Sequence, residues 1–302
     1  MTTEDAKLSA QSAVSASGPA TDDAGAVAAE AVRRRRRRRV LTYAGRLITF
    51  ALIVGGWQLL TDAKIVDAFF FGSPVGIVGR LVDWAEHGTA YGSLWEQIWI
   101  TIEEALLGFL AGVASGVVFG VALGEFRYLA DVLGPYIKVV NALPRIVLGS
   151  IFIIWLGLGM SSKVVLAAVL VFFVVFFNAF QGVRDVDRNL VANARILGAS
   201  RLQITRHVVF PSALTWIIAS LHVSLGFSII GAIVGEFLGA QQGLGLVIAT
   251  AQNTFDANGV FAAMLVIGVL ALSAEALMAQ LERRLLSWRP PSSAEVADAA
   301  VA

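Results

Sequence analysis

Long apolar runs constrain the fold of this chain more than any other feature of its sequence. A membrane-spanning helix needs about 20 mostly apolar residues. The sequence offers six such stretches, at about 43–60, 98–123, 130–156, 163–181, 212–238 and 260–283. Only 15% of the 302 residues are charged, against about 25% in soluble domains. We therefore expect an all-α integral membrane protein with about six transmembrane helices.

Two regions depart from a simple series of spans. Pro135 and Pro144 interrupt the third stretch, and each removes a backbone donor from a helix interior. This span is therefore expected to be bent or divided into two shorter pieces. Residues 61–97 mix polar and aromatic side chains around the turn-like Gly72-Ser73-Pro74, which predicts a short amphipathic helix at the membrane interface.

The first 40 residues differ in composition from the rest. Residues 1–32 are rich in Ala, Ser, Thr and Asp, and seven arginines follow, from Arg33 to Arg39. Low hydrophobicity without periodicity predicts a disordered tail over 1–40, before a transmembrane domain over 41–289 and a second disordered tail over 290–302. We interpret the arginine run as a topology determinant beside the first span. An anionic-lipid patch is the alternative, and no nucleic-acid partner is expected.

Lysine and arginine also predict the orientation. With the amino terminus inside, the inner segments carry the arginine run, Arg46, Arg127, five arginines between 182 and 211, and those after residue 282. The outer segments keep Lys64, Arg80 and Lys163. Basic residues near spans favour the cytoplasmic side. Both termini and the loop 182–211 are therefore expected there.

Composition also excludes several kinds of chemistry. The chain has no cysteine, so disulfides, Cys-ligated metals and thiol catalysis are excluded. His87, His207 and His222 form no pair at metal-ligand spacing. The glycine-rich stretch 243–247 lacks the preceding strand and the lysine of a phosphate loop. We expect no catalytic residue, metal or cofactor in this chain, and any driving energy must come from a partner.

The loop between the fourth and fifth stretches has a distinctive pattern. Apolar residues recur near helical spacing, Gly198 divides them, and Pro211 can begin the next span at its first turn. The apolar positions are Leu190, Ala194, Leu197, Ile204 and Val208. The pattern is equally consistent with two short helices forming an elbow at the membrane surface and with one amphipathic helix resting on headgroups.

This loop resembles one found in the inner-membrane permeases of binding-protein-dependent ABC importers, of the form E-A-A-x3-G-x9-I-x-L-P. The matching positions are Ala192, Asn193, Ala194, Gly198, Val208, Phe210 and Pro211. The spacing is intact, although Ala192 replaces the glutamate and Asn193 the first alanine. Segments 142–164, 177–187 and 233–248 are similar, in the same order, to the nitrate, sulfonate and taurine branch. The likeness covers about residues 65–290.

The resemblance implies a type I importer permease in a bacterial inner membrane. Residues 190–206 would be the coupling helix that docks on an ATPase subunit, which holds the ATP and Mg. The expected docking residues are Ala192, Asn193, Ala194, Arg195, Gly198, Ala199, Arg201, Arg206 and Pro211. A second permease copy, most simply identical, and an extracytoplasmic solute-binding protein complete the assembly. The expected solute is a small anion of the sulfonate, taurine or nitrate type; a pyrimidine or other small heterocycle is the alternative.

Polar residues inside spans usually face a bundle interior or a wet cavity. The candidates for a translocation path are Asn141, Pro144, Arg145, Ser224, Ser228 and Glu236. Arg145 either meets an anionic solute beside the broken helix, or lies near one membrane face, snorkelling or paired with a carboxylate. Glu236 lies near the external gate by resemblance, or makes a structural hydrogen bond. His222 is interpreted as a satisfied core histidine, and Glu103 and Glu104 receive no role.

Glycines recur at every fourth position of the second stretch, at Gly108, Gly112, Gly116, Gly120 and Gly124. Such a ladder permits close helix contact, within the subunit or at a dimer seam. Two other function classes predict different sequence features. An ion-coupled secondary transporter predicts inverted repeats and midplane charge, and an integral membrane enzyme predicts clustered His, Asp or Glu. The sequence contains neither an internal repeat nor such a cluster.

Overall fold

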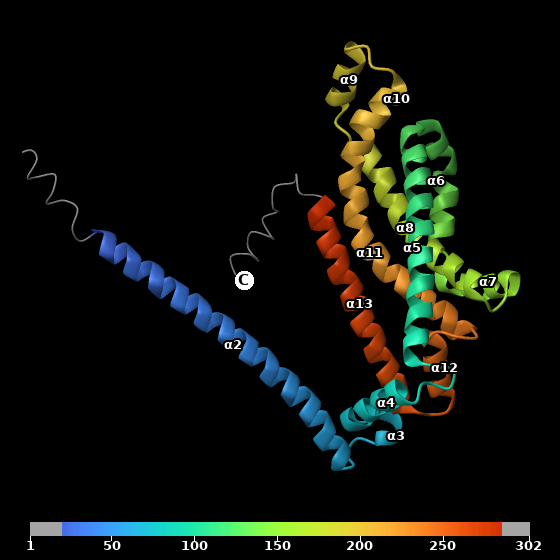
Figure 1. Ribbon diagram of the computed structural model, residues 1–302. Coiled ribbons are helices and arrows are strands. Elements are labelled where there is room, and N and C mark those ends of the chain that lie inside the picture. Colours follow the sequence, from blue (N-terminus) through green and yellow to red (C-terminus); the bar gives the residue numbers. More distant parts are fainter. Residues whose placement is uncertain (1–19, 286–302) are drawn as a thin grey trace, which may run out of the picture. The chain divides into compact units, whose positions relative to one another are not determined.

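The computed structural model describes residues 20–285, and this part of the chain is almost entirely helical (Figure 1). Five helices are long and apolar enough to cross a membrane, or six if the bent pair Tyr128–Ala142 and Arg145–Leu156 counts as one span. The prediction of an all-α membrane protein with about six spans is therefore confirmed. In order, the helices are α2 (Ala20–Asp62), α3 (Ala68–Phe71), α4 (Pro74–Glu86), α5 (Leu94–Glu125), α6 (Arg127–Ala142), η1 (Arg145–Val147), α7 (Leu148–Leu156), α8 (Met160–Arg184), α9 (Arg188–Ile196), α10 (Arg201–Ile204), η2 (Thr205–Val209), α11 (Phe210–Leu238), α12 (Leu244–Asn253) and α13 (Ala257–Leu285).

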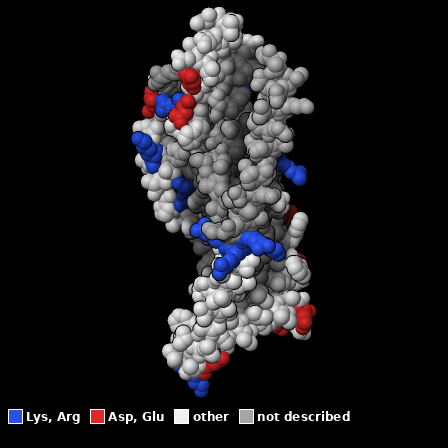
Figure 2. Space-filling model, turned by 90° about the vertical axis from the view of Figure 1, so that its left-hand side faces the viewer, with Lys and Arg blue, Asp and Glu red and all other residues white. Residues whose placement is uncertain are grey.

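The chain divides into two compact units, residues 1–60 with 290–302, and residues 61–289. In the first unit α2 is continuous from Ala20, so the structure differs from the expected disordered tail over 20–40. Alanine and arginine are both strong helix formers, which low hydrophobicity alone does not reveal. Figure 2 shows a belt of basic side chains, and Arg33 and Arg36–Arg39 of the run are exposed. The expected tails over 1–19 and 290–302 lie outside the described residues.

In the second unit α5, α8 and α11 pack together along most of their length. The glycine ladder of α5 faces α8. A Cβ added at Gly108, Gly112, Gly116 or Gly120 would come within 3.0 Å of atoms on α8. The ladder therefore serves packing within the subunit, which is the first of its two interpretations, because a methyl group at any of these positions would push the two helices apart.

The third span is bent, as its prolines predict. The axes of α6 and the η1–α7 segment differ in direction by 76°, and Leu143, directly before Pro144, has an extended backbone with ψ of 139°. A residue before proline is driven out of the helical region by the proline ring, which ends α6 there. Pro135, in contrast, stays inside α6.

At the end of the bundle labelled α9 and α10 in Figure 1, the loop 182–211 forms an elbow, defined here as α9, the Gly198 turn and α10. Two short helices divided by Gly198 are thus confirmed, and a single amphipathic helix is not observed. Pro211 lies in the first turn of α11, as expected, although α10 and η2 lead into α11 without a break, so that one helical segment runs from Arg201 to Leu238. A π-helical turn, η2, precedes the proline, and the Phe210 N–H donates to the Thr205 carbonyl. This wider turn accommodates a residue that cannot donate a hydrogen bond itself.

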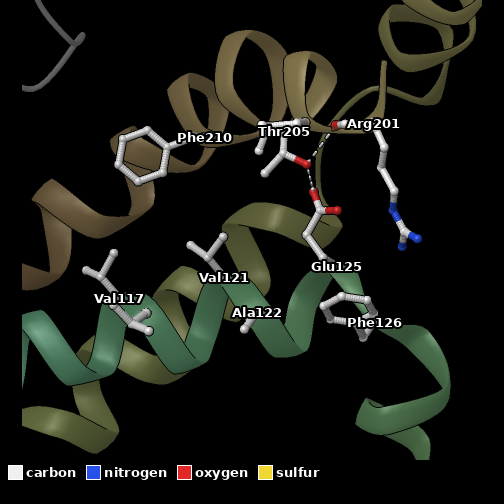
Figure 3. A pocket seen from close by; sticks show the side chains of 10 residues that line it. Val117, Val121, Ala122, Glu125, Phe126, Arg201, Thr205 and Phe210 are labelled. Atoms are coloured by element: carbon white, nitrogen blue, oxygen red, sulfur yellow. Dashed lines mark hydrogen bonds between the residues drawn. The ribbon is translucent and has the colours of Figure 1, made fainter. Parts of the chain in front are cut away.

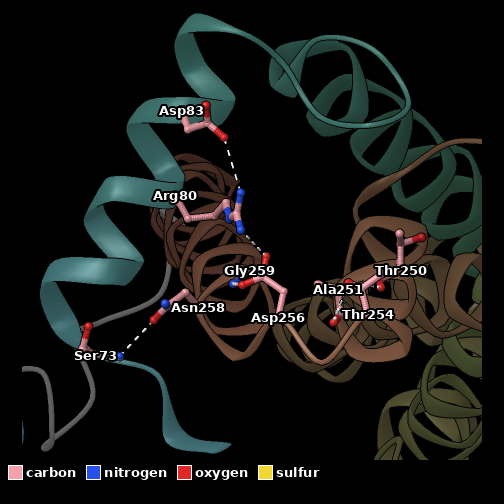
Figure 4. A network of polar contacts seen from close by, with 9 residues as sticks. All are labelled: Ser73, Arg80, Asp83, Thr250, Ala251, Thr254, Asp256, Asn258 and Gly259. Atoms are coloured by element: carbon pink, nitrogen blue, oxygen red, sulfur yellow. Dashed lines mark hydrogen bonds and ion pairs between the residues drawn. The ribbon is translucent and has the colours of Figure 1, made fainter. Parts of the chain in front are cut away.

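At the opposite end the amphipathic helix expected within 61–97 is present as α4, with Ile77 and Trp84 buried on one face. Figure 4 shows how it is held against the start of α13. The Ser73 N–H donates to Asn258 Oδ1 at 2.9 Å, and Arg80 Nη2 lies 2.8 Å from Asp256 Oδ2. Asp256 also accepts from the Gly259 N–H at 3.0 Å, so it caps α13 and pairs with α4 at once.

Candidate functional site

Local backbone interactions determine the shape of the elbow. Asp187 caps α9 by accepting from the Asn189 N–H at 2.8 Å, and Ser200 with Gln203 forms a capping box at the start of α10. Between them Gly198 has φ of +81°, and the Ala199 N–H donates to the Ala194 carbonyl at 3.0 Å. This six-to-one bond with a left-handed glycine is a Schellman ending. The turn is therefore fixed by the sequence around it rather than by tertiary contacts.

The elbow exposes large apolar side chains at its tip. Ile196, Leu197 and Leu202 are 82%, 87% and 77% exposed. The helical pattern of the sequence identified Leu197, but it did not identify Ile196 or Leu202. Of the expected apolar face, Ala194, Ile204 and Val208 pack instead on a core cluster at the inner end of α8 and α11. The tip therefore presents apolar area that the described part of the chain does not cover.

The expected docking residues divide into two groups. Ala194 and Ala199 are partly buried, whereas most of the set is exposed, namely Ala192, Asn193, Arg195, Gly198, Arg201, Arg206 and Pro211. Arg195 and Arg201 line a cavity of about 510 Å³ beneath the elbow, together with Arg184 and Glu125. The elbow thus combines apolar tips with a basic underside.

Two contacts join α10 and the η2 turn that follows the elbow to the inner end of α5 and its C-cap, Phe126 (Figure 3). Thr205 Oγ1 donates to Glu125 Oε1 at 3.1 Å, and the Arg201 guanidinium lies 5.2 Å from the centre of the Phe126 ring. Between the same elements is a cavity of about 580 Å³, lined mostly by apolar side chains such as Val117, Val121 and Phe210. A displacement of α10 would therefore act directly on the inner end of α5.

At the opposite end of the bundle, Glu236 belongs to a buried polar cluster, here called the outer clamp: Gln97, Thr101 and Glu236 with the backbone of 243–245. Glu236 is 0% exposed, and its carboxylate accepts from the Thr101 hydroxyl at 2.7 Å and from the Gly245 N–H at 2.6 Å. Gln97 Oε1 accepts from the Gly243 N–H at 2.7 Å, and Thr101 Oγ1 from the Leu244 N–H at 3.0 Å. The backbone N–H groups of Gly243, Leu244 and Gly245, at the start of α12, therefore all have acceptors. Glu236 thus has the structural role that was one of its two interpretations.

Sequence reasoning missed the other members of this cluster. Gln97 and Thr101 lie on α5, more than 130 positions from Glu236, and only the fold brings them together. Lys163, expected in an outer segment, is 1% exposed and donates to the carbonyls of Leu158 and Gly159. Glu104, which received no role, is 3% exposed and next to Glu236.

The remaining path candidates do not form one site in this chain. Ser224 and Ser228 are fully buried in the bundle, and the Ser228 hydroxyl donates to the Leu225 carbonyl at 2.7 Å. Asn141 and Arg145 lie together at the break beside Pro144, where Arg145 Nη2 donates to Asn141 Oδ1. His222, expected to be satisfied, pairs with Glu282 of α13.

Similarity to known proteins identifies the class of this protein. Residues 112–287, more than half of the chain, match the family of binding-protein-dependent transport system inner membrane components. The chain belongs to this family. It is the permease subunit of an ABC importer, a multi-pass membrane protein that works with an ATPase and a solute-binding protein, and it is a transport subunit rather than an enzyme.

Similar proteins include permeases for several solutes. A riboflavin transport system permease of Chloroflexus aurantiacus is 33% identical over 81% of this chain and 90% of its own length. A putative aliphatic sulfonates transport permease of Bacillus subtilis is 32% identical over 86% and 93%. The taurine transport system permease of Escherichia coli is 27% identical over 80% and 88%. Among solved structures, the inward-facing methionine ABC transporter has the same fold, with a TM-score of 0.57 at 18% identity over 63% of this chain and 95% of that chain.

Proposed function

We propose that this permease imports a small anionic solute of the sulfonate or taurine type, and that its elbow is the docking site for the ATPase. The observation that carries the proposal is the exposed tip. Ile196, Leu197 and Leu202 are each at least 77% exposed, at the tip of the loop that resembles the coupling helix. Apolar side chains at this exposure favour a partner surface.

In the proposed assembly two copies of the chain form the membrane-spanning part, with two ATPase subunits that bind ATP and Mg on the cytoplasmic side. Both termini and the elbow face the cytoplasm, and the solute-binding protein docks at the opposite end. Closure of the ATPases moves the elbows. Through Thr205 and Glu125, 3.1 Å apart, each elbow pulls on α5, and the two bundles rock between inward-open and outward-open states.

Loss of the motif glutamate at Ala192 fits this arrangement. The apolar tip supplies most of the binding free energy, and Arg195 and Arg206, both exposed, can meet acidic side chains of the ATPase. Exposed ion pairs contribute only about 0–1 kcal/mol each, so replacing one polar contact by alanine is a small change beside burial of three apolar side chains.

The test is co-purification of the permease with its ATPase. Leu197→Asp is expected to reduce the amount of bound ATPase at least tenfold, because a carboxylate would be buried in an apolar contact without a partner. Ile65→Asp is the matched control, since Ile65 is 73% exposed but lies in the segment between α2 and α3. Equal ATPase binding by both variants would refute docking at the elbow.

A further inference from the structure

Arg145 brings a positive charge to the middle of the membrane-spanning bundle. Its guanidinium carbon lies 4.8 Å from the centre of the Phe173 ring on α8. Phe173 is near the midpoint of the 25-residue α8, eleven residues before its end at Arg184, which corresponds to about 16 Å of helix. Half of a hydrocarbon core measures about 15 Å. The group therefore lies close to the midplane, too deep for a snorkelling arginine.

At this depth Arg145 has no acidic partner among the side chains that the structure describes. The ion pairs of this region join other residues, and the recorded hydrogen bond of the guanidinium goes to the neutral Asn141. A guanidinium has five N–H donors, and Arg145 is only partly buried. Stacking on Phe173 supplies part of the missing solvation. The expected alternative, a pairing with a carboxylate, is thus not found in the described chain, and donors remain free to bind an anion.

Further cations continue from this point toward the cytoplasmic end of α8. Lys138 of α6 and Arg184 line a cavity of about 390 Å³ between α6 and α8, together with Phe176, Phe177 and Phe180. The Arg184 guanidinium lies 5.0 Å from the centre of the Phe180 ring. Among the described residues lining this cavity, Asp131 near the start of α6 is the acidic one. Cations thus predominate along this face from the midplane to the inner end.

We propose that Arg145 binds the anionic group of the solute at the midplane, and that Lys138 and Arg184 attract it onward along the aromatic face of α8. This inference rests on the proposed function and defines the solute as a compact anion such as a sulfonate. A neutral heterocycle would not be attracted electrostatically by Arg145, Lys138 and Arg184. The acidic residues of the outer end do not oppose it, because Glu104 and Glu236 are 3% and 0% exposed and held within their own cluster.

The natural absence of cysteine allows a direct test with the full-length chain in membrane vesicles. Asn141→Cys places a thiol next to Arg145, and its reaction is measured with two methanethiosulfonate reagents of similar size, one bearing a sulfonate and one a trimethylammonium group. We expect the sulfonate reagent to react about tenfold faster, since a cationic cleft concentrates anions. Adding Arg145→Gln should bring the ratio to about one, and Arg145→Lys should largely preserve it.

Tyr128→Cys, at the start of α6 and 84% exposed, is the matched control, and Arg145→Gln should leave its ratio unchanged. Failure of both reagents to reach Cys at position 141, or a ratio that does not respond to Arg145→Gln, would overturn the proposal. Labelling requires neither ATP nor the natural solute. A negative labelling result therefore does not count against ATPase docking at the elbow. If docking at the elbow is refuted, the labelling rates still test the role of Arg145.

Discussion

The two ends of the bundle each contain a left-handed glycine turn, and they hold it in opposite ways. At the outer clamp, Gly243 has φ of +110°, and an added Cβ would lie within 3 Å of the Glu236 carboxylate. At the elbow, Gly198 has φ of +81°, and an added Cβ would meet nothing within 4 Å. The outer turn is fixed by buried side chains of this chain. The backbone of the elbow is fixed by local hydrogen bonds, and its surface is free to contact a partner.

This difference separates stability from coupling. Changes at the outer clamp should lower the free energy of unfolding of the isolated permease, since every donor there has a buried acceptor. Changes at the elbow should leave the isolated chain folded and weaken its response to the ATPase.

Glu236→Ala should destabilise the chain most. It leaves the Gly245 N–H buried without its acceptor, at about 1–3 kcal/mol, and it takes from the Thr101 hydroxyl the closer of two acceptors, the other being the Gln97 carbonyl at 3.1 Å. The space left by the removed side chain adds a cavity cost of about 1–2 kcal/mol. We expect a loss of about 3 kcal/mol or more, measured by thermal unfolding of the purified permease. Glu275→Ala, at an exposed carboxylate of α13, should change stability little. Equal melting temperatures for both variants would contradict the outer clamp as a stabilising unit.

Gly243→Ala and Gly198→Ala apply one change to both turns. Each forces alanine into the left-handed region, at about 1–2 kcal/mol, but only Gly243→Ala also overpacks a buried site, for about 1–3 kcal/mol more. The first variant should lower the melting temperature clearly. The second should lower it slightly and reduce ATPase stimulation. Gly268→Ala, where an added Cβ meets nothing within 4 Å and the backbone is helical, is the control.

Thr205→Val should affect coupling more than folding. It removes the hydroxyl that donates to Glu125, a loss of about 1 kcal/mol, while keeping the shape of the side chain. We expect less solute transported per ATP hydrolysed, with assembly unchanged. Thr205→Ser should retain wild-type behaviour, because it keeps the hydroxyl. An unchanged ratio of transport to hydrolysis in Thr205→Val would show that this contact does not transmit movement.

Arg80→Gln should have the smallest effect. Its pair with Asp256 is partly exposed, with 38% of the arginine side chain accessible, and such pairs contribute about 0–1 kcal/mol. A decrease in stability of about 0.5 kcal/mol, vanishing at high salt, is expected from melting curves at two ionic strengths. A loss comparable to that of Glu236→Ala would mean that the outer end depends on its surface contacts as much as on its buried cluster.

The sequence pattern was equally consistent with the elbow and with a single amphipathic helix, and the signals that favour the elbow are local. Gly198 stands between two short apolar patterns, Ser200 is followed three residues later by Gln203, and neither feature needs the rest of the fold. The bend at Pro144 is local for the same reason. Pro211 lies in the first turn of α11, as its missing N–H favours, but no sequence signal indicated the π-helical turn that precedes it.

The sequence alone was enough for the all-α membrane class, the approximate number of spans, the bend at Pro144 and the resemblance to a permease family, since apolar length, turn residues and motif spacing are properties of contiguous segments. The packing of the helices was needed to show that Gln97 and Thr101 hold the turn at Gly243, and that Arg145 stacks on Phe173 without a carboxylate partner among the described residues. Burial and pairing depend on residues far apart in the chain. Their neighbours are set by helix packing, which no local pattern encodes.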